Sequence, residues 1–229
     1  MQTAHARWIV ALAVLGASLI GVLVALRMSF ALYRVPSGSM LPTLAVDARV
    51  WANRWSRTPE RGDVIVFALP ENPEQEFVKR VIAVEGDTLE IHEGHPTING
   101  WVVPSCRVGS WSYEDPDLLP PRHEGDLYVE FLGTHSYLVF LDAHATTAAT
   151  GPFVAKPDDH WVLGDNRFNS HDSPMWFGGA GAGVPRSLIR GRVSEPARPK
   201  LPRGAESLRA ALDECLSKRP AQTTPPPRR

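Results

Sequence analysis

Residues 77–84 read Phe-Val-Lys-Arg-Val-Ile-Ala-Val, a run of mostly apolar residues with two basic residues at its centre. A run of this length, rich in β-branched side chains, is typical of a β-strand, whose successive side chains point to opposite faces. The pattern predicts Phe77, Lys79, Val81 and Ala83 on one face and Arg80 on the other. Lys79 would then lie between apolar neighbours, and such surroundings favour the neutral amine.

A serine in a restrained turn precedes this strand. Residues 35–44 read Val-Pro-Ser-Gly-Ser-Met-Leu-Pro-Thr-Leu. Gly38 permits a tight backbone path, while Pro36 and Pro42 restrict the chain on either side. Ser39 is the candidate nucleophile, and Lys79 is the candidate base that takes its proton. Alone, such a cluster of Pro, Gly and Ser is more typical of an ordinary loop, and it is the lysine block that favours chemistry.

Short strands with turn signals surround these two blocks. Strands are predicted at residues 49–52, 64–67 and 88–91, and the Asn-Gly pair within residues 97–103 predicts a two-residue hairpin turn. A second hairpin around Gly133 would join residues 127–131 and 136–140. Loops are predicted at residues 105–124 and 178–183, which are rich in turn-forming residues. The body of the chain is therefore predicted to be mostly β.

The N-terminal region contains one long apolar run. Residues 8–26 carry no charge, and a helix of that length, at about 1.5 Å per residue, nearly spans a hydrocarbon core of roughly 30 Å. We expect a transmembrane helix, with a cleaved signal peptide as the alternative. Arg7 precedes the run while Arg27 and Arg34 follow it, a distribution that slightly disfavours a cytoplasmic N-terminus.

The C-terminal region changes in composition. Residues 196–229 are rich in Pro and Arg, with a short amphipathic helix predicted at 206–218 and a disordered tail from 220. The expected organisation is a short segment (1–7), a transmembrane helix (8–26), a β-rich domain (27–195) and this extension (196–229).

Composition and cysteine content exclude some classes of protein. The chain has 24 basic and 25 acidic residues, so its charge gives no reason to expect nucleic-acid binding. Cys106 and Cys215 are too few for a disulfide scaffold, and we expect two unpaired thiols.

A third block completes a family resemblance. Residues 164–173 read Gly-Asp-Asn-Arg-Phe-Asn-Ser-His-Asp-Ser. With the serine and lysine blocks, it resembles the signatures of bacterial signal peptidase I, in the same order along the chain. The resemblance implies a catalytic domain of coiled antiparallel β-sheets behind one transmembrane helix, on the periplasmic side of the bacterial inner membrane. This implied topology outweighs the weak charge asymmetry.

The resemblance also implies an activity. The family members are serine endopeptidases with a Ser/Lys dyad, which remove N-terminal signal peptides from exported preproteins after small residues of the Ala-x-Ala type. The substrate would bind as an added β-strand, no cofactor would be required, and the partners would be signal peptides, the lipid bilayer and the export machinery.

Further site residues follow from the same comparison of blocks. Ser37 matches the residue whose hydroxyl joins the Ser39 backbone N–H in an oxyanion hole, and Ser170 and Asp172 match residues that support the lysine. The sequence departs from the family at Phe168, where Asp is usual, and at Pro174, where Arg is usual. Asp172 thus lacks its expected partner.

Several alternatives stay open. A dedicated processing peptidase of a secretion or conjugation system would share this chemistry, and a catalytically silent anchored β-domain could bind signal peptides. A Ser/His/Asp triad using His171 or His160 is disfavoured because no Gly-x-Ser-x-Gly elbow is present. His92 and His95 lack a third ligand, so no metal is implied. Asp165 and Asn166 also fit an ordinary polar turn.

Overall fold

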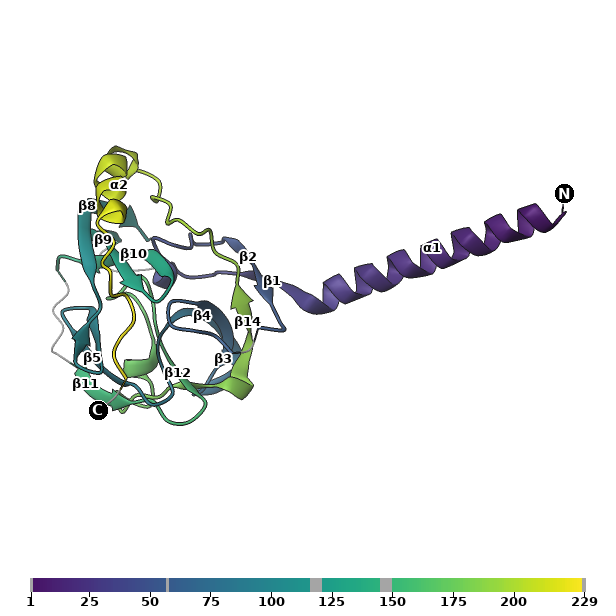
Figure 1. Ribbon diagram of the computed structural model, residues 1–229. Coiled ribbons are helices and arrows are strands. Elements are labelled where there is room, and N and C mark those ends of the chain that lie inside the picture. The colour runs from purple at the N-terminus through teal and green to yellow at the C-terminus, as the bar shows by residue number, and fades with distance from the viewer. Residues whose placement is uncertain (1, 57, 116–120, 145–149, 228–229) are drawn as a thin grey trace.

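The computed structural model describes residues 2–56, 58–115, 121–144 and 150–227. It begins with helix α1 (Gln2–Ser29), which projects away from a β-rich body (Figure 1). The helix contains all of residues 8–26, so the helical conformation predicted for that run is confirmed. Among the described residues, no helix was found that is both long enough and apolar enough to cross a membrane.

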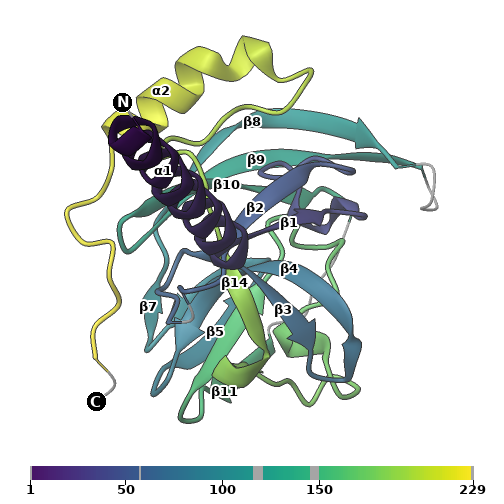
Figure 2. The same cartoon turned by 90° about the vertical axis from the view of Figure 1, so that its right-hand side faces the viewer.

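A seven-stranded antiparallel sheet forms the centre of the body (Figure 2). Its strands lie in the order β1 (Phe30–Arg34), β2 (Arg49–Asn53), β14 (Ile189–Val193), β3 (Val64–Leu69), β4 (Asn72–Val84), β12 (Asp159–Leu163) and β13 (Val184–Pro185). The predicted strands at 49–52, 64–67 and 77–84 are confirmed, and each is longer than expected. β12 pairs with β4 only within residues 80–84, through a register shift between Trp161 and Val162.

Two smaller antiparallel sheets complete the body. One contains β10 (His135–Asp142), β9 (Arg122–Leu132) and β8 (Ser105–Glu114), and the other β11 (Thr150–Val154), β5 (Thr88–His92), β6 (His95–Ile98) and β7 (Trp101–Val102). Both predicted hairpins are confirmed. Asn99 and Gly100 adopt φ values of 54° and 76° between β6 and β7, and Gly133 adopts 60° between β9 and β10. Positive φ at both central residues is what the Asn-Gly pair supplies to a two-residue turn.

The loop predicted over residues 105–124 is wrong for most of its length. Residues 105–114 form β8, which pairs along β9, and β9 itself begins at Arg122. The reason is visible in the side chains: Val108 and Trp111 are buried, while Ser110 and Ser112 between and beyond them are exposed. The alternation of a half-buried strand was present, but the serines and glycine concealed it. Residues 116–120 lie outside the described residues. The loop predicted at 178–183 is confirmed.

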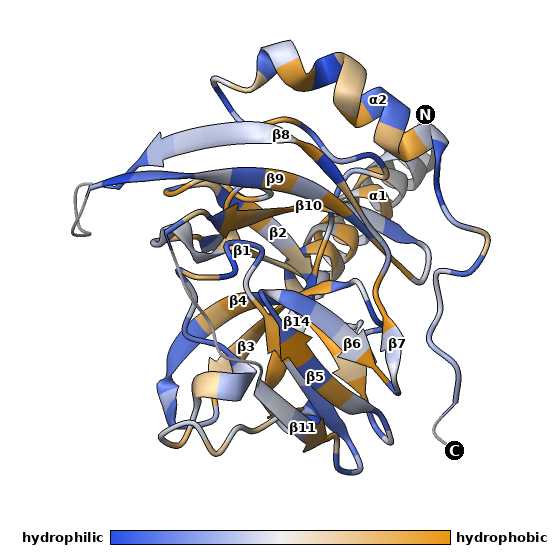
Figure 3. Ribbon diagram, turned by 90° about the vertical axis from the view of Figure 1, so that its left-hand side faces the viewer, coloured by the Kyte–Doolittle hydropathy of each residue, from blue (hydrophilic) through white to orange (hydrophobic). Residues whose placement is uncertain are grey.

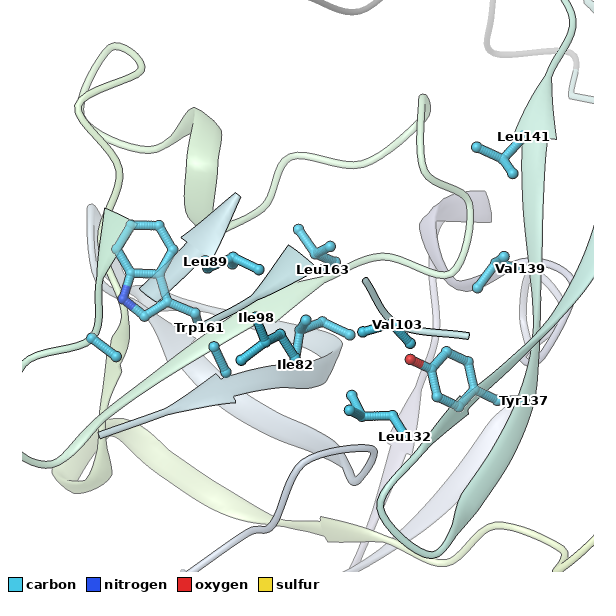
Figure 4. Packing of buried hydrophobic residues seen from close by; sticks show 12 residues of the cluster. Ile82, Leu89, Ile98, Val103, Leu132, Tyr137, Val139, Leu141, Trp161 and Leu163 are labelled. Atoms are coloured by element: carbon cyan, nitrogen blue, oxygen red, sulfur yellow. The ribbon is translucent and has the colours of Figure 1, made fainter. Parts of the chain in front are cut away.

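The core lies where the sheets meet. Figure 4 shows the cluster that joins all three, with Ile82 from β4, Leu89 from β5, Tyr137 from β10 and Trp161 from β12. Figure 3 shows strongly apolar residues on strands inside the body, whereas the ribbon of β8 is pale blue over much of its length. Burial at the junction of three sheets fixes their relative position, because the apolar area is removed from water only when all three meet.

The C-terminal extension packs against the body. A turn at Glu206–Leu208 leads into α2 (Arg209–Ser217), which confirms the predicted helix. The expectation of unpaired thiols is wrong: Cys106 on β8 and Cys215 on α2 form a disulfide, with Cα atoms 5.7 Å apart. The expected disordered tail is also wrong for the described residues. Gly133 N–H donates to Thr223 O at 2.7 Å, and Asn99 Nδ2 donates to Pro226 O at 2.8 Å.

Candidate active site

The nucleophile candidate sits in a turn that is held from two sides. Ser39 lies in the short 3-10 turn Gly38–Met40, and Met40 is fully buried in an apolar cluster. Asn166 holds the turn from the other side: its side-chain amide donates to Gly38 O at 3.1 Å and its backbone N–H to Ser39 O at 3.1 Å. Asn166 thereby fixes two consecutive carbonyls of the turn. Fixing this backbone also fixes the direction of the Ser39 side chain.

Lys79 reaches this turn from the middle of the sheet. Lys79 lies on β4 opposite Ile65 of β3, its side chain is 2% exposed, and its Nζ lies 2.6 Å from Ser39 Oγ. Burial lowers the pKa of Lys79 to about 8, although the nearby charges of Asp172 and Asp165 raise it. The structure thus brings the two predicted residues into direct contact and provides the apolar surroundings that favour a neutral amine.

Ser37 lies at the same site. Its Oγ is 3.2 Å from Ser39 Oγ, and either hydroxyl can be the donor. Ser37, Ser39 and Lys79 line a cavity of about 380 Å³ together with residues of β1 and β4. A second cavity, of about 470 Å³, lies around Arg80 and contains none of these three residues.

The two supporting residues lie behind the lysine. Asp172 is 5% exposed, its Oδ2 accepts the Gly164 N–H at 3.0 Å, and burial raises its pKa while the charge of Lys79 lowers it. Ser170 packs against Gly164, where a Cβ would lie 2.3 Å from Ser170 Oγ, so only glycine fits. Pro174 is buried and offers Asp172 no charge. Phe168, the other departure, packs against the cluster that joins the sheets.

Arg80 faces away from the site, as the strand pattern predicts. It is 1% exposed and forms two hydrogen bonds with Asp165, at 2.8 and 2.7 Å, and two with Glu195, at 3.0 and 2.9 Å. A buried arginine of this kind is tolerated only when its donors are satisfied, as they are here. Asp165 therefore anchors the third block to β4. The alternative interpretation of Asp165 as an ordinary polar turn residue does not account for these bonds.

Sequence reasoning missed two further residues at the site. Asn166 was compatible with a turn, and Tyr113 lay in the segment predicted as a loop. Tyr113 Oη accepts hydrogen bonds from Asn166 at 2.8 Å and from Asn169 at 3.4 Å, and its ring stacks on Trp111 with centroids 5.4 Å apart. The alternation of apolar and polar residues within 105–114 was the one sequence pattern that indicated a strand at Tyr113.

Histidines are engaged elsewhere. His171 Nε2 lies 2.7 Å from Glu71 Oε2, and burial lowers the pKa of His160. His92 pairs with Glu90, and His95 with Glu130. Across the described part of the chain, no group of three or more metal-ligating side chains was found. The arrangement at Ser39 is a serine hydroxyl in contact with a buried amine.

Comparisons with known proteins identify the family of this chain. The family model described as "Signal peptidase, peptidase S26" matches residues 5–197. Signal peptidase I of Pseudomonas aeruginosa is 31% identical over 168 residues, which cover 63% of this chain and 54% of that protein. Signal peptidase I of Aquifex aeolicus is 28% identical over 191 residues, or 70% of this chain and 73% of that protein.

A solved signal peptidase I from Enterococcus faecalis is 22% identical, with a TM-score of 0.34, over 60% of this chain and 97% of that one. This chain spans about half the length of the Pseudomonas relative that it matches. The family model nevertheless covers all three sequence blocks and both members of the Ser39 and Lys79 pair. The chain belongs to the signal peptidase family, peptidase S26.

Proposed function

We propose that this protein is a signal peptidase I, an endopeptidase that removes N-terminal signal peptides from exported preproteins. The observation that carries the proposal is the 2.6 Å contact between Ser39 Oγ and the amine of the fully buried Lys79. A hydroxyl attacks an amide only when its proton is accepted, and an amine that is neutral near physiological pH can accept it.

The proposed mechanism has two steps, acylation of Ser39 and hydrolysis of the acyl ester, and Lys79 transfers protons in both. Neutral Lys79 takes the proton of Ser39 while Ser39 Oγ attacks the scissile carbonyl. Lys79 then returns this proton to the leaving amine. Water next attacks the acyl ester while Lys79 accepts one of its protons, and Lys79 passes that proton to Ser39 Oγ as the ester bond breaks and the acid product leaves. The Ser37 hydroxyl and the Ser39 backbone N–H would stabilise the negative oxygen of each tetrahedral intermediate. No cofactor takes part.

The substrate site is proposed to be the cavity between β1 and β4. β1 is the edge of its sheet, and β4 pairs with β12 only within residues 80–84, so β4 residues 76–79 lie beside the cavity outside that pairing. An extended peptide could add to such an edge as a strand. Val35, Val66 and Val78 give the cavity apolar walls, which suit the small side chains of an Ala-x-Ala sequence.

We also propose that α1 anchors the protein in the inner membrane, with the catalytic body on the periplasmic side. Large apolar side chains of α1 are exposed, among them Trp8 at 72%, Leu15 at 69% and Ile20 at 63%. An isolated helix that exposes such residues requires an apolar environment. Contact with the lipid bilayer, signal peptides and the export machinery follows from this placement.

The test is cleavage of a preprotein by the purified protein in detergent. Ser39→Ala and Lys79→Ala should each abolish cleavage, and the double variant should be no slower than either, because the two groups act as a unit. Ser136→Ala, which removes a hydroxyl of β10 that accepts from Arg219 Nη1 and does not line the cavity at Ser39, is the control for general damage. Near-normal cleavage by Lys79→Ala would disprove the dyad, and no Ser39-dependent cleavage by the wild type would favour a silent binding domain.

A further inference from the structure

The turn between β3 and β4 holds the segment that carries Asp172. Glu71 lies in this turn and accepts two hydrogen bonds: its Oε1 from the Phe177 backbone N–H at 2.7 Å, and its Oε2 from His171 Nε2 at 2.7 Å. These two bonds lower the pKa of Glu71 below its usual value. One carboxylate therefore ties both sides of Asp172 to the β3–β4 turn.

The contacts continue from this carboxylate to the dyad. The ring of His171 meets the edge of Phe77, with centroids 6.3 Å apart, and Lys79 Nζ lies 5.4 Å from the centre of the Phe77 ring. His171 also directly follows Ser170 and precedes Asp172 in the chain. The position of residues 170–172 beside the lysine is therefore coupled to the hairpin through His171.

The segment also has contacts along its middle: Ser173 Oγ accepts the Val162 N–H at 2.9 Å, and Ser173 O accepts the Ala182 N–H at 3.0 Å. Asp172 accepts the Gly164 N–H, and Trp176 is fully buried against Phe67, with ring centroids 5.8 Å apart. After Phe177 the chain continues through glycines with positive φ, at 68° for Gly178 and 88° for Gly179. Glycine in this conformation restrains the backbone weakly. Glu71 binds the segment on both sides of the buried Trp176, through His171 before it and the Phe177 N–H after it.

We propose that Glu71 is a positioning residue for the peptidase reaction, which clamps residues 171–177 to the β3–β4 turn and so keeps Asp172 and Ser170 closed over Lys79. This role rests on the proposed function. The clamp works through His171 and the Phe177 amide and touches neither the substrate nor the reacting atoms. Releasing it would admit water to the lysine, since burial is the largest influence on its pKa.

The experiment compares Glu71→Ala and Glu71→Gln in the full chain. Alanine removes both bonds, and we expect kcat to fall about 10- to 100-fold, because small misplacements at a catalytic site have effects of this size. The midpoint of the pH profile should rise toward the ordinary lysine value. Glutamine can still accept the Phe177 N–H and donate to neutral His171, so it should restore most of kcat and the midpoint. Glu74→Ala, exposed on the same hairpin, is the matched control.

A second measurement does not depend on catalysis. In a Ser39→Ala background, the Phe177 amide should exchange hydrogen slowly, and adding Glu71→Ala should accelerate it by about 10-fold or more as local opening becomes easier. Unaltered exchange and an unaltered pH midpoint in Glu71→Ala would overturn the clamp, even if kcat falls. Failure of wild-type cleavage with the exchange result intact would instead overturn the proposed function.

Discussion

At the scale of single residues, the behaviour of Lys79 follows from its enclosure. The protein cannot solvate the charged amine as water does, so burial lowers the pKa of Lys79 to about 8 against the opposing charges of Asp172 and Asp165. The neutral fraction grows as pH rises through that value. We therefore predict that kcat/KM increases with pH along a limb with its midpoint at about 8, measured with a peptide substrate and checked by titrating Lys79 in Ser39→Ala.

Two histidine variants serve as controls for this prediction. His160→Asn should leave a single limb near pH 8, and His171→Asn should leave no limb at the ordinary histidine value, because neither ring has a hydrogen bond to Ser39 among the described residues. A limb near the ordinary histidine value of about 6.5 that vanishes in either variant would support a triad. A lysine that titrates at its ordinary value of about 10.4 would contradict the buried amine.

A second prediction concerns Ser37. Ser37→Ala should lower kcat by about 10²–10³, with little change in KM, because an oxyanion donor acts on the charge of the transition state. The contact that motivates this is the 3.2 Å separation of the Ser37 and Ser39 hydroxyls. Steady-state kinetics of Ser37→Ala beside Ser105→Ala, an exposed serine of β8, would measure it. An unchanged kcat would make Ser37 an ordinary turn residue.

Residue types and the resemblance of three blocks predicted the pairing of Ser39 with Lys79, but they did not reveal what holds these two residues. Ser39 and Lys79 each carried a local signal, a restrained turn and an apolar strand. The holding groups carry none: Asn166 acts through an amide that meets Gly38 only after folding. Phe168 likewise gave no sign of its packing against the central cluster. Such partners depend on contacts between segments far apart in the chain, which local patterns do not encode.

At the scale of elements, strands were predicted where β-branched residues were continuous, and missed where packing decided the conformation. β4 was evident from its apolar run. β8 was not, because Ser and Arg occupy its exposed positions and its buried residues are Val108, Gly109 and Trp111. The strand forms because β9 pairs along it and α2 covers it. The disulfide could not be predicted, since nothing in the sequence places α2 beside β8.

That disulfide leads to a prediction at the same scale. Cys215→Ser should lower the free energy of unfolding by about 2–4 kcal/mol, because the bridge closes a long loop and restricts the unfolded chain. The two cysteines are separated by 109 residues. Urea unfolding measures the change, with reduced wild type expected to match the variant and Ser217→Ala, on the same helix, expected to match the oxidised wild type. Equal midpoints for the oxidised wild type and Cys215→Ser would contradict a stabilising bridge.

At the scale of the whole molecule, the site exists because three distant blocks converge at strand β4. The third block is fixed to β4 through Arg80 and Asp165, while Lys79 points from the next position of the same strand toward Ser39. The three blocks could be recognised from their order along the chain. The alternation of side chains along a strand predicted that Lys79 and Arg80 point to opposite faces. The curvature that brings β1 and β4 to either side of one cavity depends on the packing of all three sheets, which no single segment contains.

The last prediction concerns how the molecule is held in the cell. If α1 is a membrane anchor, the mature chain should retain residues 8–26, and it should stay in the membrane fraction after a carbonate wash. The double variant Leu15→Arg and Leu19→Arg should shift the protein to the soluble fraction, because each charge near the middle of a spanning helix costs about 2.5–3.5 kcal/mol. Both leucines are exposed on α1, so the folded body should not be disturbed.

The alanine pair Leu15→Ala and Leu19→Ala is the matched control, since it shortens the same side chains without adding charge and should remain in the membrane. Protease added from the periplasmic side should reach the body that contains Ser39, because a signal peptidase must meet its substrates where they emerge. A mature N-terminus at about residue 27 would make the segment a cleaved signal instead, although its apolar run is longer than the roughly 7–15 residues typical of such peptides. Cytoplasmic exposure of Ser39 would reverse the proposed topology, and with it the access of the dyad to exported chains.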